Sequence, residues 1–219
     1  MEELKALPNL SAEEVRVLGS LLEKSKTTPE YYPMTLNALQ TACNQKTSRK
    51  PVVNYDESTI INTLDSLRKK GLISTVVGGG SRVTKYKHNL AIQFPLLPQE
   101  LAALCLLFLR GPLTGGEINS NSGRLYEFES LEEVQELLQK LSTDEPAYVQ
   151  QLSKKPGQKE ARFVHLFSPF DEEAYEESSA SETEASTGKY AQLEERVQQL
   201  EQQLATLQAS FDKLMEELS

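Results

Sequence analysis

Apolar residues in the first ninety positions recur first at helical spacing and then at strand spacing. LSAEEVRVLGSLLEK (10–24) predicts a compact helix, and Ile60, Leu64 and Leu67 form the apolar stripe of a later one. A short Thr-led segment (35–44) lies between them. The later helix ends in LRKKG, after which β-branched residues alternate in two runs joined by three glycines. The predicted order is three helices and a β-hairpin.

The same order recurs in the next eighty residues. LPQELAALCLLFLRG (97–111) corresponds to the first helix and TGGEINSNSG (114–123) to the Thr-led segment. A third helix carries the apolar stripe Val134, Leu138 and Leu141, and two further strand-like runs close the unit. The simplest explanation is an internal repeat of helix, helix, helix and hairpin.

Local residues support the predicted helix ends. SAEE (11–14) and SLEE (130–133) each predict a capping box, in which the Ser side chain caps an amide and the Glu reaches back. Gly71 follows a basic last turn and predicts a left-handed helix end. We expect Tyr31 and Tyr32 to pin a loop against the first helix.

The last fifty residues have two different patterns. Residues 171–188 are rich in Ser and Glu and have almost nothing to bury, so they predict a disordered linker. Apolar residues then alternate by three and four over about four heptads, the pattern of a coiled coil. These positions are Tyr190, Leu193, Val197, Leu200, Leu204, Leu207, Phe211, Leu214 and Leu218. We favour a homodimer, and docking onto another protein's helix is the alternative.

The net charge of −9 is unevenly distributed. Residues 1–90 hold 13 Lys and Arg against 9 Asp and Glu, and residues 91–170 hold 7 against 10. Residues 171–219 hold 3 against 13, so most of the acid lies in the tail. Because a surface potential follows the charge within about 10 Å, an acidic chain can still have a basic face.

Three helices followed by a hairpin describe a winged-helix unit, whose third helix enters the major groove of DNA while the hairpin lies along the backbone. The glycine tip, Gly78–Gly80, would allow a close approach to phosphates. The predicted backbone contacts are Lys46, Arg49, Lys50, Arg68, Lys69, Lys70, Arg82, Lys85 and Lys87. The predicted contacts to base edges are Ser58, Thr59, Asn62 and Ser66. Surface cations also occur without DNA, and winged helices also dock proteins.

The sequence does not favour an enzyme. Its two histidines, His88 and His165, lie in strand-like contexts, and nothing resembles a catalytic or metal-binding cluster. Cys43 and Cys105 are far apart, which indicates packing in a reducing cytoplasm and no disulfide. No apolar run reaches the length of a membrane span, and no cofactor is expected.

Several strings closely resemble the YceH-like family of uncharacterised bacterial proteins. They are YYPMTLNALQTACNQKTSRKPV (31–52), LDSLRKKGLI (64–73), GSRVTKYKH (80–88), LLFLRGPLTGGEI (106–118), SGRLYEF (122–128) and PGQKEARFVHLF (156–167). The resemblance covers residues 10–168 and implies two tandem winged-helix domains. It brings no catalytic or ligand-binding residues. Asn119, Ser120 and Asn121 stand where relatives tend to carry arginines, which weakens a phosphate-binding role for the second unit.

We therefore predict a mainly α protein with small β-hairpins (α+β). Its parts are winged-helix domains at 1–92 and 93–170, the acidic linker at 171–188 and a coiled coil at 189–219. The predicted function is non-enzymatic DNA binding by the first domain, as a transcriptional regulator. The alternative is a protein-interaction scaffold within a chromosome-organising or regulatory complex, without direct DNA binding.

Overall fold

The computed structural model describes residues 6–78, 81–154, 160–172, 175, 196–199 and 201–203; for 78, 81 and 82 it describes the backbone alone. Residues 1–170 form one compact unit, and residues 171–219 belong to a second one. Among the described residues, every helix is too short or too polar to cross a bilayer.

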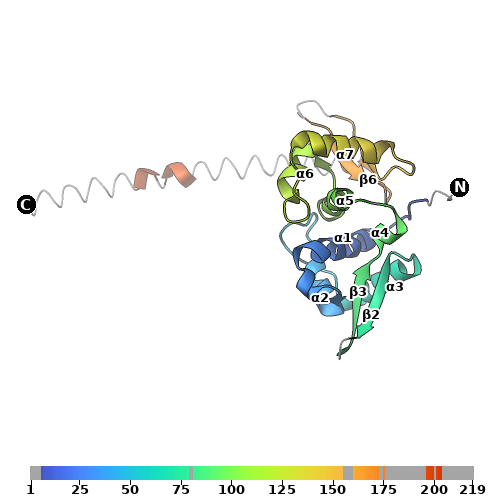
Figure 1. Ribbon diagram of the computed structural model, residues 1–219. Helices are drawn as coiled ribbons and strands as arrows, with labels where there is room; N and C mark the ends of the chain where they lie inside the picture. Colours follow the sequence, from blue (N-terminus) through green and yellow to red (C-terminus); the bar gives the residue numbers. More distant parts are fainter. Residues whose placement is uncertain are drawn as a thin grey trace, which may run out of the picture. The chain divides into compact units, whose positions relative to one another are not determined.

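The described part of residues 1–170 is mixed α and β, with helices and two small antiparallel sheets (Figure 1). The first repeat contains α1 (Ala12–Thr27), η1 (Pro29–Tyr31), β1 (Met34–Thr35), α2 (Leu36–Cys43), α3 (Glu57–Lys69), β2 (Ile73–Gly78) and β3 (Ser81–His88). A short helix, α4 (Leu90–Gln93), follows. The second repeat contains α5 (Pro98–Arg110), β4 (Leu113–Thr114), α6 (Gly115–Ser122), α7 (Leu131–Thr143), β5 (Val149–Gln151) and β6 (Arg162–His165).

Each repeat builds its sheet in the same way. The hairpin strands pair antiparallel, and a two-residue strand before the second helix adds to the outer side of the returning strand, giving the orders β1-β3-β2 and β4-β6-β5. Thr35 and Thr114 end these short strands and also cap α2 and α6, accepting from Ala38 N and Glu117 N. One threonine therefore joins sheet to helix in each repeat.

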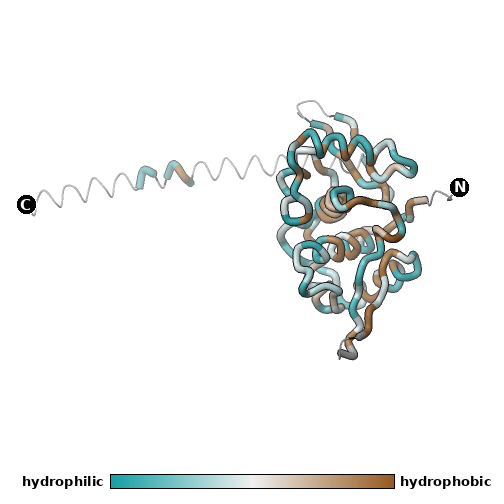
Figure 2. Tube along the Cα trace, viewed as in Figure 1, coloured by the Kyte–Doolittle hydropathy of each residue, from teal (hydrophilic) through white to brown (hydrophobic). Residues whose placement is uncertain are grey.

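The core lies where α1 and α5 pack side by side, and Figure 2 shows the hydrophobic stretches gathered there. Leu18 and Leu21 of α1 and Leu104 and Leu107 of α5 are completely buried. Gly19 permits the close approach, because a Cβ there would lie 2.9 Å from Phe108 Cβ. The two repeats therefore share one core.

The predicted helix ends are confirmed in part. Ser11 and Glu14 form the capping box, and Gly71 has φ 73°. Ser130 caps Glu133 N, but the Glu133 carboxylate accepts from Glu129 N, one residue earlier than predicted. Of the two tyrosines expected to pin a loop against the first helix, Tyr32 is hydrogen-bonded to the end of β3. Tyr32 OH accepts from His88 N at 2.7 Å, whereas Tyr31 is 73% exposed.

Most of the predicted tail lies outside the described residues. Of the nine heptad positions, Val197 alone is described; it lies in a helical segment and is exposed. The predicted linker is described only at Asp171, Glu172 and Tyr175, and the predicted glycine tip only at Gly78.

Candidate nucleic-acid interface

The outer face of the first sheet carries two of the predicted phosphate contacts. Strand alternation points Lys85 and Lys87 away from the core, whereas Tyr86 between them packs against it. Both lysines are half-buried, since β3 is the central strand and its neighbours flank their stems. Among the described residues, neither side chain has a carboxylate partner within ion-pair distance.

The exposed face of α3 is close to neutral. Asn62 and Lys69 are exposed there beside Ile61, which is 41% exposed. Arg68 is exposed too, but its Nη2 lies 3.0 Å from Asp65 Oδ1. The positive charge of this helix face is therefore partly matched within the helix itself.

Two predicted contacts at the end of α3 are used internally. Ser66 Oγ donates to Glu14 Oε1 at 2.7 Å, and Lys70 Nζ donates to Glu14 Oε2 at 2.6 Å. Burial would raise the pKa of Glu14, but the hydrogen bonds from Lys70, Ser11 N and Ser66 outweigh it and lower that pKa. Ser66 and Lys70 therefore fasten α3 to the start of α1.

The start of α3 gives a similar result for Ser58 and Thr59. The Ser58 hydroxyl donates to Asp56 Oδ1 at 2.9 Å, and Thr59 N donates to the same oxygen at 2.7 Å. Ser58 stays exposed and Thr59 is half-buried, so both remain at the surface beside the helix N-terminus.

Arg49 has to be removed from the predicted set. Its guanidinium is buried and donates to both carboxylate oxygens of Glu23, at 3.1 and 2.6 Å, and to the carbonyl oxygen of Ala42. A side chain held in this way cannot reach a phosphate. Its neighbours Lys46 and Lys50 are exposed on the same α2–α3 loop.

Hydrogen bonds to its backbone also hold the loop between α2 and α3. Arg16, which was not among the predicted residues, donates to the carbonyl oxygens of Cys43 and Pro51, at 3.2 and 2.6 Å. Asn44 exchanges two hydrogen bonds with the backbone of Tyr55, each 2.8 Å long. Arg82 lies in β3, and its side chain is outside the described part of the chain.

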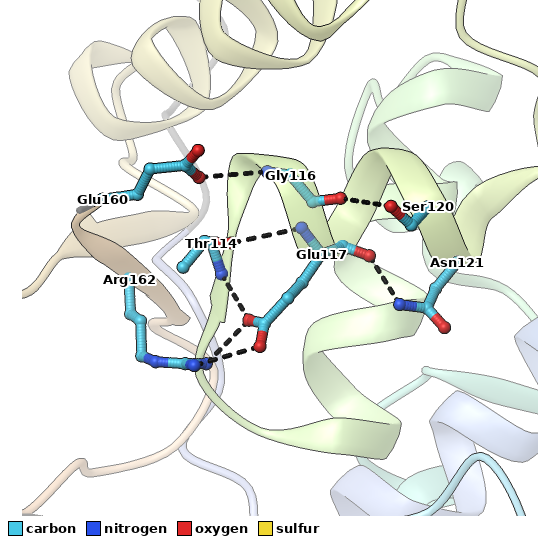
Figure 3. Close-up of a pocket in the computed structure, with 7 residues that line it drawn as sticks. All are labelled: Thr114, Gly116, Glu117, Ser120, Asn121, Glu160 and Arg162. Carbon is cyan, nitrogen blue, oxygen red and sulfur yellow. Dashed lines mark hydrogen bonds and ion pairs between the residues drawn. The ribbon is translucent and has the colours of Figure 1, made fainter. Parts of the chain in front are cut away.

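The second repeat neutralises the cation that corresponds to Lys85. Thr35 pairs with Lys85 across the first sheet, and Thr114 pairs with Arg162 across the second. Arg162 binds both carboxylate oxygens of Glu117, at 2.7 and 3.0 Å (Figure 3). Glu117 and Arg162 line an open pocket of about 430 Å³, where Glu160 also accepts from Gly116 N. With two carboxylates and one guanidinium, the lining of this pocket has no surplus of positive charge.

The helix of the second repeat that corresponds to α3 is acidic. Glu132 and Glu136 are exposed on α7, and the ammonium of Lys140 lies 2.6 Å from Glu100 Oε1. Carboxylates on this face would repel the phosphates of a DNA backbone. The two repeats therefore have the same order of elements but differ in their surface charge and ion pairs.

His165 and both cysteines are buried, and His88 is half-buried with its Nε2 3.3 Å from Ser25 Oγ. Burial lowers the pKa of His165 to about 4, and burial together with the charge of Lys26 lowers that of His88 to about 4. Burial raises the pKa of the Cys43 thiol to about 11, so it is not an activated thiolate. Within the described residues, no group of three metal-binding side chains gathers.

Comparison with known proteins gives a consistent result. A family described as "Protein of unknown function, DUF480" matches residues 10–158. A "UPF0502 protein" of Shewanella halifaxensis is 47% identical over 212 residues, which cover 94% of this chain and 99% of the relative. A "UPF0502 protein" of Shewanella pealeana is 47% identical over 213 residues, covering 94% and 98%.

Proposed function

This chain belongs to the DUF480 family, and we propose that it is a cytoplasmic, non-enzymatic protein that binds duplex DNA through its first repeat and regulates transcription. The first repeat acts as a winged helix, with α3 directed at the major groove and the β2–β3 hairpin along the backbone. The second repeat is a winged helix that shares its core and makes no contact with the DNA backbone.

The observation that carries this proposal is the different charge pairing of Lys85 and Arg162. Lys85 and Arg162 occupy the same position in the two sheets, since each pairs with the threonine that caps the next helix. Arg162 forms an ion pair with Glu117, whereas Lys85 has no carboxylate partner among the described residues. The third residue of α2 is Ala38, whereas the third residue of α6 is Glu117. Cations without a carboxylate partner leave positive potential for an anionic backbone. Lys85 and Lys87 are therefore the central phosphate contacts.

The other contacts are exposed residues elsewhere on the first repeat. Lys46 and Lys50 on the α2–α3 loop and Lys69 on α3 are exposed and would reach further phosphates. Asn62 is the proposed base-reading residue, because an exposed amide on a recognition helix can bind adenine through two hydrogen bonds.

The C-terminal heptads are proposed to join two chains as a homodimer. A second role, docking of a protein partner, is favoured for the second repeat by the exposed carboxylates Glu132 and Glu136. Such a partner would present a basic surface. The two roles are compatible, since they use different repeats.

The test is the salt dependence of binding to a random-sequence duplex, measured by fluorescence anisotropy. If each subunit of a dimer neutralises three or four phosphates, the slope of log K against log salt should be about −5 to −7. Lys85→Glu with Lys87→Glu should weaken binding by at least about tenfold and reduce that slope.

The matched control puts the same charge change on the second repeat, as Arg124→Glu with Lys154→Glu. Both residues are exposed, and the control should bind DNA within about twofold of the original chain. A salt-independent affinity, or equal losses in the two double variants, would contradict the proposal.

A further inference from the structure

We propose that a cleft between the two repeats binds a small phosphorylated molecule, a sugar phosphate or a nucleotide. The cleft has a volume of about 490 Å³, within the roughly 300–1,000 Å³ of small-molecule sites. Its walls come from the end of α1, the α2–α3 loop, the end of α5, and the end of α6 with the turn after it. The site does not depend on the proposed DNA contacts, none of which lines it.

The lining has an excess of positive charge. The lining contains three cations, Lys24, Arg110 and Arg124. It contains one carboxylate, that of Glu23. Glu23 is already matched by the buried Arg49, whose Nη2 lies 2.6 Å from Glu23 Oε2. Lys24 Nζ shares that oxygen at 3.1 Å, so one carboxylate serves two cations. The surplus charge favours an anion.

The two arginines indicate which anion fits. Arg110 Nη2 donates to Ser48 Oγ at 3.1 Å, which holds the guanidinium at the wall. Arg124 is exposed on the turn that follows α6. Guanidinium groups bind phosphate through paired hydrogen bonds, and two of them can share a terminal phosphate that carries nearly two charges.

The remaining lining suits the polar part of such a ligand. Hydroxyl and amide side chains come from Thr27, Gln45, Ser120 and Asn121, and they match the hydroxyl groups of a sugar. Leu106, Leu109 and Leu125 supply an apolar portion. The strings 106–118 and 122–128, which the proposed DNA interface does not use, contribute both arginines and the three leucines of this lining.

The experiment is isothermal titration calorimetry on the full chain in low-salt buffer without phosphate. AMP and ribose 5-phosphate are compared with adenosine and ribose, which lack only the phosphate. We expect the phosphorylated probes to saturate one site per chain with at least about tenfold higher affinity than their partners. Arg110→Gln with Arg124→Gln should weaken their binding by at least about tenfold.

The control variant, Arg68→Gln with Lys69→Gln, removes two positive charges from α3 and should change probe affinity by less than about twofold. Amide NMR shifts confined to Gly123, Arg124 and their neighbours would support the site and would also verify folding of the variants. Equal losses in both variants, or no binding of either phosphorylated probe up to about 10 mM, would overturn the proposal. So would a loss of DNA affinity in Arg110→Gln/Arg124→Gln matching that of Lys85→Glu/Lys87→Glu, since the cleft would then be part of the duplex surface.

Discussion

At the scale of single residues, the surroundings of a basic side chain decide whether it stabilises the fold or is exposed to a partner. Arg49 and Lys50 are adjacent in the sequence, yet Arg49 is buried against Glu23 and Lys50 is exposed. Burying a guanidinium is costly unless a carboxylate and further acceptors receive its hydrogen bonds, as Glu23 and Ala42 O do here. The ion pair between Arg49 and Glu23 therefore fixes the α2–α3 loop.

Replacing Glu23 should destabilise the protein strongly. Glu23→Ala leaves the buried Arg49 without its carboxylate, which costs about 3–5 kcal/mol of the unfolding free energy. Urea denaturation measures the change. The matched control is Glu30→Ala, because Glu30 is exposed and should shift stability by less than about 0.5 kcal/mol. A small loss in Glu23→Ala would show that the pair contributes little.

The two histidines should make stability fall as the pH falls. Their pKa values of about 4 in the fold lie below the ordinary 6.5, so between these values only the unfolded chain takes up the protons. Stability is therefore fully present above about pH 6.5 and decreases toward pH 4, by up to ~1.4 kcal/mol per pH unit for each histidine.

Replacing one histidine tests this sign. His165→Gln should flatten the pH dependence of the unfolding free energy between pH 6.5 and 4, whatever its effect on stability at pH 8. Burial of His165 and its edge contact with Phe108, 4.8 Å between ring centroids, make some loss at all pH values expected. An unchanged slope would mean that His165 is protonated in the fold.

At the scale of elements, the pairing of α1 with α5 depends on a missing side chain. Gly19→Ala would ordinarily stabilise a helix by about 0.5–1 kcal/mol. Here the new Cβ would lie 2.9 Å from Phe108 Cβ and 3.0 Å from Leu109 Cδ2, so overpacking should reverse the sign and cost about 1–3 kcal/mol.

Thermal or urea unfolding provides the measurement, with Gly123→Ala as the control. Gly123 has φ −49°, and a Cβ there meets nothing within 4 Å, so its replacement should be neutral or slightly stabilising. A Gly19→Ala protein at least as stable as the original would mean that the two helices can separate without cost.

The order of elements could be predicted from the sequence because the main helices and hairpins repeat a local pattern. Ile60, Leu64 and Leu67 are all buried, as their spacing indicates. The two-residue strands Met34–Thr35 and Leu113–Thr114 could not be predicted, since they exist only by pairing with distant β3 and β6. A stretch that short has no periodicity of its own.

The candidate interface was predictable in composition but not in charge pairing. Ser66 and Lys70 looked like surface groups, whereas Glu14, more than fifty residues earlier, binds both. Glu100 holds Lys140 at the equivalent place in the second repeat. Glu14 and Glu100 are each the third residue of their helix, a correspondence that the aligned strings 10–24 and 97–111 miss by one residue.

At the scale of the whole molecule, charge divides the chain into parts with different expected partners. The tail carries 3 basic against 13 acidic residues, so it would repel a phosphate backbone. In a DNA-binding protein, the tail would help by joining two chains. A dimer makes twice as many phosphate contacts as a single chain, although each subunit keeps the same number of cations.

Disrupting the heptads should therefore change mass and DNA affinity together. Leu200→Lys with Leu207→Lys places charges at two d positions. Light scattering should find a single chain for this variant and a dimer for the original chain. With half the phosphate contacts, the salt slope should fall to about −3. Gln202→Lys with Ala209→Lys adds the same charge at outward f positions and should stay dimeric. A Leu200→Lys/Leu207→Lys protein that remains a dimer would place the self-association elsewhere, while a monomer with an unchanged slope would mean that one subunit makes all the DNA contacts.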